Sequence, residues 1–109
     1  MPTPHERRVK ELEARRSIIA DLEALIESST GTVPAADVVK AFERGIALLP
    51  PNSKLEPTFE GLAKRLRNEG AGRIAESGLR QLHGRLRRDA EDVGRVVDAR
   101  DEKLRAKHG

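Results

Sequence analysis

The stretch GLRQLHGRLRRDAEDVGRVVDARDEKL, residues 78–104, decides the fold expected for this chain. Apolar residues recur along it every three or four positions, which is the spacing of one helical face, and the pattern extends to both sides. We therefore expect a helix over about residues 72–106, which at about 1.5 Å per residue would be roughly 50 Å long. The strongest members of its apolar face are Leu79, Leu82, Leu86, Val93 and Val97.

Arginines lie on the opposite face of the same predicted helix. Such a row suits either a solvated surface with ion pairs such as Glu76–Arg80 and Glu91–Arg95, or a set of contacts to phosphates. Mixed charge on a helix is more often a solvated surface, and acids neutralise the row further along, so the first interpretation is favoured. The candidate contacts to nucleic acid or to an acidic partner are Arg73, Arg80, Arg87 and Arg88.

A second long amphipathic pattern lies near the N-terminus and predicts a helix over about residues 4–29. Thr3 suits the N-cap, and Gly31 suits a left-handed residue that ends the helix. Arg8 and Arg15 interrupt an otherwise coiled-coil-like apolar seam. The seam residues of this helix are Leu12, Ile19, Leu22 and Ile26.

Two shorter helices are expected between the long ones. The first covers about residues 34–49 and is stopped by two prolines, and Gly45 inside it would permit a close approach of another helix. The second covers about residues 57–68, with Glu56 or Thr58 as its cap. The connection between them, residues 50–56, is longer than the turn of three or four residues in a DNA-binding helix-turn-helix.

The expected architecture is all-α and forms a single helical domain over residues 1–109. No sustained alternation of apolar and polar residues predicts a strand, and no internal repeat is apparent. A glycine-containing hinge, residues 68–72, separates the third helix from the fourth. We expect the two long helices to pack as an antiparallel coiled-coil-like hairpin, either within one chain or across a dimer.

Composition narrows the classes of function. Hydrophobic residues make up 37% of the chain and charged residues 36%, which fits helices with narrow apolar stripes. The chain has no cysteine, and we expect a cytoplasmic protein without a secretory signal or a membrane span. The net charge of +3 is a small excess for a dedicated nucleic-acid binder.

No catalytic, metal or cofactor motif occurs in the sequence. The glycine-containing stretch over residues 69–78 lacks the P-loop pattern and follows a predicted helix instead of a strand. His5, His83 and His108 are far apart in the sequence and fit surface histidines better than metal ligands. We therefore expect neither an enzyme nor a protein with a cofactor, a metal or a small-molecule substrate.

The function that the sequence favours is a non-enzymatic helical protein–protein interaction module, such as an adaptor, chaperone or assembly factor. We expect it to act through the aliphatic seams, by forming a homodimer or by binding a helical protein partner. The alternative is a dimeric accessory protein that binds duplex DNA through phosphate contacts from the arginine row.

Overall fold

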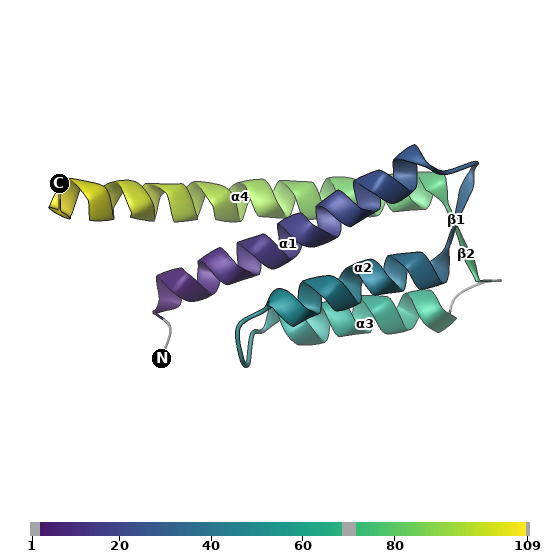
Figure 1. The fold of residues 1–109 in the computed structure, drawn as a ribbon, viewed down its shortest axis with the longest axis horizontal. Helices are drawn as coiled ribbons and strands as arrows, with labels where there is room; N and C mark the ends of the chain where they lie inside the picture. Colours follow the sequence, from purple (N-terminus) through teal and green to yellow (C-terminus); the bar gives the residue numbers. More distant parts are fainter. Residues whose placement is uncertain (1–2, 69–71, 109) are drawn as a thin grey trace.

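The computed structural model describes the backbone of residues 3–68 and 72–108 and the side chains up to Lys103. Its all-α architecture is the one that the sequence predicts. The start of α1 and the end of α4 lie at one end of an elongated molecule of 54 × 26 × 16 Å, and two short strands lie at the other (Figure 1). The elements are α1 (Pro4–Glu27), β1 (Thr32–Pro34), α2 (Ala35–Leu48), α3 (Leu55–Asn68), β2 (Arg73–Ala75) and α4 (Glu76–His108).

The two strands contradict the prediction that the chain has none. β1 and β2 pair in antiparallel orientation, with Val33 opposite Ile74. Each strand is only three residues long, so neither could show an alternating pattern in the sequence. Because residues 73–75 form a strand, the last helix begins at Glu76 and not near residue 72 as predicted.

The ends of α1 follow from its capping residues. The Thr3 hydroxyl accepts a hydrogen bond from the backbone N–H of Glu6 at 3.1 Å, as expected for an N-cap. The helix ends at Glu27, with Ser28 as its C-cap, and Gly31 has the predicted positive φ of 112°. The sequence therefore predicted the start of α1 and the reversal of the chain after it.

The start of α3 differs from the sequence prediction. The helix begins at Leu55, and neither Glu56 nor Thr58 caps it. The hydroxyl of Ser53 accepts a hydrogen bond from the Leu55 N–H at 3.2 Å and donates one to Oε2 of Glu11 at 2.7 Å. Ser53 is buried, so this contact ties the loop before α3 to α1.

The long helices α1 and α4 pack antiparallel within one chain. His5 Nε2 lies 2.7 Å from Asp101 Oδ1 at one end of the pair, and His83 Nε2 lies 3.0 Å from Glu23 Oε1 at the other. His83 is therefore part of a helix contact and not the bare surface histidine that the sequence suggested. The predicted seam is occupied inside the chain: Leu12, Leu22, Leu79, Leu86 and Val97 are buried, and Ile19, Ile26, Leu82 and Val93 are half-buried.

α1 and α2 pack tightly against each other at Gly45. A Cβ atom at this position would overlap the side chain of Ile18 and lie 3.2 Å from the carbonyl oxygen of Ala14. The expected role of this glycine in close helix approach is confirmed. The main core lies around this crossing, where the Phe42 and Phe59 rings bring α2 and α3 together at a centroid distance of 6.0 Å.

The chain contains an internal repeat that the sequence did not reveal. The element boundaries next to the two strands follow their counterparts by 41 residues, the separation of Thr32 and Arg73 at the starts of the strands. The ends of α1 and α3 are also 41 residues apart, and so are the starts of α2 and α4. We call residues 14–48 the first unit and residues 55–89 the second unit.

Backbone contacts at the strands also come in pairs that are related by the 41-residue offset. Gly31 and Gly72, which precede the two strands, both have positive φ angles, of 112° and 80°. The Ala35 N–H donates to the Gly72 carbonyl at 2.8 Å, and the Glu76 N–H donates to the Gly31 carbonyl at 3.0 Å. The two helix–loop–helix units are thus joined through a local pseudo-twofold arrangement of their loops.

Candidate docking site between α3 and α4

The two units differ in how their own helices pack. α1 and α2 lie in close contact along the first unit, whereas α3 and α4 make few close approaches in the second. The counterparts of Gly45 and Ile18 in the second unit are Leu86 and Phe59. Because both counterparts are larger, the tight crossing of the first unit cannot form in the second.

A small pocket lies between α3 and α4, where the first unit has its tight crossing. Its volume is about 120 Å³, slightly less than the roughly 150 Å³ of an engineered cavity that binds benzene. The pocket therefore has room for about one apolar side chain. Its apolar lining comes from Leu55, Phe59, Leu62, Leu82 and Leu86.

These apolar side chains are not equally covered by the protein. Phe59 and Leu86 are buried, with 2% and 6% of their surface exposed. Leu55, Leu62 and Leu82 are only half-buried and leave apolar surface open to solvent. The pocket consequently has a buried apolar floor and a partly accessible aliphatic wall, a form that suits a site that receives a side chain.

Thr58 of α3, two arginines and one acid complete the lining of the pocket. Arg15 reaches it from α1 and is half-buried, and Arg85 and Asp89 come from α4 and are exposed. Neither arginine takes part in any of the ion pairs that the described side chains form. Arg15 is one of the residues that interrupt the predicted α1 seam, and the structure places this interruption at the pocket.

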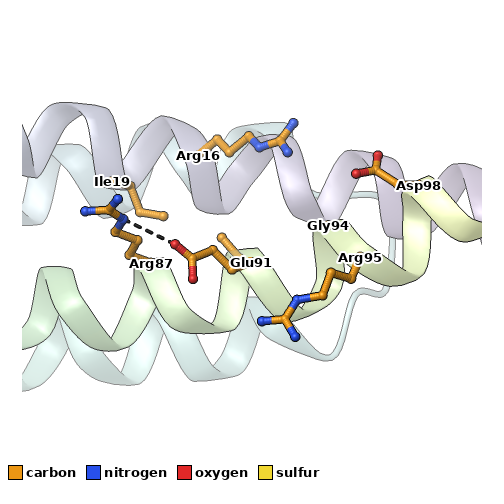
Figure 2. Close-up of a pocket in the computed structure, with 8 residues that line it drawn as sticks. Arg16, Ile19, Arg87, Glu91, Gly94, Arg95 and Asp98 are labelled. Carbon is orange, nitrogen blue, oxygen red and sulfur yellow. Dashed lines mark ion pairs between the residues drawn. The ribbon is translucent and has the colours of Figure 1, made fainter.

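A wider cleft of about 490 Å³ lies between α1 and α4 and carries mixed charge (Figure 2). Arg16 of α1 and Arg87, Glu91, Arg95 and Asp98 of α4 surround it. Arg87 Nε pairs with Glu91 Oε1 at 3.4 Å, so part of this charge is already balanced. The alternation of cations and anions selects no ligand of one sign, and we assign no site here.

The arginine row predicted from the sequence is broken at its first member. Arg73 lies on β2 instead of a helix, and its Nε donates to the Thr32 hydroxyl at 2.7 Å. Arg80 pairs with Glu76 at 3.3 Å, as predicted. Arg88 Nε lies 3.4 Å from the Gly84 carbonyl on its own helix.

The second predicted ion pair on this face, Glu91–Arg95, does not form. Glu91 pairs with Arg87, at i and i−4, and not with Arg95. Arg95 instead lies 3.3 Å from Asp92. These residues are well exposed, and pairs of this kind contribute little to stability. The arginines are therefore held by weak local contacts and are not gathered into one site.

A pair of helix–loop–helix units is also an arrangement that can hold metal ions. Helix–loop–helix units hold calcium when the loop supplies several carboxylates and other oxygen ligands, including a bidentate Glu at the last position. Within the described residues, no cluster of three or more His, Cys, Asp or Glu side chains could hold a metal ion. The reciprocal backbone hydrogen bonds of Gly31 and Gly72 connect the loops directly.

Comparisons with known proteins add no assignment. No family model matches the chain, and neither a curated protein nor a solved structure is significantly similar to it. None of the helices, as far as the structure describes them, is long and apolar enough to cross a membrane.

The sequence predicted two of the pocket's apolar residues as interface residues, but it did not predict that they line a pocket. Leu82 and Leu86 belong to the predicted α4 seam, whereas Leu55, Phe59 and Leu62 were not predicted as site residues. Their regular spacing is that of any core-facing stripe, so periodicity alone could not separate a filled interface from an open one. The signal that could have found the pocket is the separation of Gly31 and Gly72, which aligns Gly45 with Leu86.

Proposed function

We propose that this chain is a non-enzymatic protein–protein interaction module that binds a helical segment of another protein between α3 and α4. The observation that carries the proposal is the difference between the two units: one is closed by Ile18 against Gly45, and the other leaves an apolar pocket. A half-buried aliphatic wall beside a buried apolar floor suits a groove that receives the apolar face of a helix.

This proposal moves the interaction surface away from the seams expected from the sequence. The seam side chains contribute to the cores between α1, α2 and α4, so a second copy of the chain is not needed to cover them. Leu82 and Leu86 belong to both sets, because they line the pocket from α4. An adaptor or assembly factor in the cytoplasm remains the class of function that fits, and the absence of cysteine suits that compartment.

The proposal is tested by filling the pocket. Leu62→Trp places a larger side chain at the half-buried wall, and Leu48→Trp makes the same change at an exposed leucine of α2. A partner recovered from the native cell with the unmodified chain would be identified, purified and titrated against both variants by calorimetry. We expect Leu62→Trp to abolish binding and Leu48→Trp to keep it. Equal binding by both variants would place the partner elsewhere.

The alternative, binding of duplex DNA, has less support. Its proposed contacts are dispersed, since Arg73 lies on β2 and the other three arginines make local contacts on α4. The connection of α2 to α3, residues 49–54, also exceeds the turn of a helix-turn-helix.

A salt titration separates this alternative from the preferred function. If DNA is the partner, affinity should fall about a thousandfold or more between low and physiological salt for six or more phosphate contacts. Replacing Arg80, Arg87 and Arg88 with Ala should flatten that dependence. We expect the chain to show no such salt-dependent binding of duplex DNA. Duplex binding whose affinity falls steeply with salt, and less steeply after these substitutions, would favour the alternative.

A further inference from the structure

The first unit has an ion pair between its helices that the described residues of the second unit lack. In the first unit, Arg44 of α2 lies 3.5 Å from the carboxylate of Asp21 on α1, beside the tight crossing. The 41-residue offset makes Arg85 the counterpart of Arg44 and Leu62 the counterpart of Asp21. Arg85 therefore occupies the position of a paired arginine, while the position of its carboxylate is held by a leucine of the pocket wall.

A second cation lies at the same pocket. Arg15 is half-buried beside Arg85, and both line the pocket together with Leu62. A guanidinium that is partly removed from water gains more from a carboxylate than a fully exposed one does, because the interaction is screened less. The planar guanidinium also binds a carboxylate through two parallel hydrogen bonds.

We propose that the segment bound between α3 and α4 is an acidic amphipathic helix. It places one bulky apolar side chain in the pocket and, one turn away, a carboxylate against Arg85 and Arg15. Residues at i and i+3 or i+4 of a helix lie on one face, so a single helical turn can supply both groups. This inference rests on the proposed function and adds the chemistry of the partner to it.

The charge of the pocket also links the direction of the bound helix to the order of its acid and its apolar anchor. Asp89 lines the pocket four residues after Arg85, one turn further along α4. A carboxylate of the partner is attracted at Arg85 and repelled at Asp89. The acid must therefore lie on the Arg85 side of the apolar anchor, so a peptide whose acid precedes the anchor and one whose acid follows it should bind in opposite directions.

The test is a selection from a library of helical peptides on the full chain. The peptides share an alanine-rich scaffold, and the positions of one face are randomised. We expect the enriched peptides to combine a bulky apolar residue with Asp or Glu three or four residues away. The Arg85→Glu variant should enrich Lys or Arg at that position instead.

A matched control is available on the same helix. Arg87 lies about 200° around α4 from Arg85 and lines the charged cleft on the other side, so Arg87→Glu should select the same peptides as the unmodified chain. For a single enriched peptide, replacing its acid with the neutral amide should weaken binding roughly tenfold to the unmodified chain. The same replacement should have a smaller effect on binding to Arg85→Gln, where only Arg15 remains to contact the acid.

The outcomes distinguish this inference from the proposed function. Enriched peptides that lose binding to Leu62→Trp but show no preference for acids, or the same preference on Arg85→Glu, would overturn the acidic helix and leave the docking site in place. If no enriched peptide is sensitive to Leu62→Trp, both the inference and the proposed function fail.

Discussion

The first and second units have the same order of elements and different interiors. In the first, a glycine at the crossing lets Ile18 of α1 reach the backbone of α2. In the second, Leu86 takes the place of that glycine, and a pocket remains between the helices. The difference indicates that side-chain volume at the two crossing positions decides whether a helix–loop–helix unit is closed on itself or keeps room for another side chain.

The largest effect should come from removing the side chain that closes the first unit. Ile18 is fully buried, and we expect Ile18→Ala to lower the free energy of unfolding by about 3 kcal/mol. Leu62→Ala, at the half-buried wall of the pocket, should lower it by about 1 kcal/mol, because less apolar surface is lost. Urea unfolding measures both. Equal losses would mean that the second interface is as closed as the first.

A smaller effect is expected from forcing the first unit open. In Gly45→Leu, the residue of the second unit replaces the glycine of the first, and the overlap with Ile18 should cost about 2 kcal/mol. Gly84→Leu is the matched control on α4, because no atom lies within 4 Å of a Cβ placed there. It should be neutral or slightly stabilising, since leucine favours a helix more than glycine does. A tolerated Gly45→Leu would refute the role assigned to the crossing.

The smallest effect concerns the charges that distinguish the units. Arg44 is exposed, so breaking its pair through Asp21→Asn should cost only about 0.5 kcal/mol. Arg85→Gln should change stability less still, because Arg85 has no carboxylate partner among the described residues. The two variants are compared by thermal unfolding at low salt. A clear loss of stability in Arg85→Gln would show that its guanidinium already has a partner within the chain.

The helices were predictable from the sequence because each carries a local signal. The apolar period of α4, the Thr3 cap of α1 and the glycine at position 31 each act over a few residues. The strands were not predictable, since their pairing joins residues about 40 positions apart, such as Val33 and Ile74, and each strand is too short for a pattern. The start of α3 was missed because its cap, Ser53, lies outside the apolar period.

The candidate site was predicted only in part for a related reason. A leucine at a core-like position looks the same in the sequence whether its neighbour fills the space or not. The difference lies in pairs of residues from separate helices, such as Phe59 and Leu86, whose combined size sets the distance between α3 and α4. The difference becomes visible only when the 41-residue offset pairs Ile18 with Phe59 and Gly45 with Leu86.

The most direct test of the docking site is a calorimetric titration of one helical partner onto the unmodified chain and onto Leu62→Trp. Circular dichroism and urea unfolding would first establish that the variant keeps the fold. The site between α3 and α4 predicts saturable one-to-one binding to the unmodified chain and no measurable heat with Leu62→Trp. Unchanged affinity for a folded Leu62→Trp variant would contradict it.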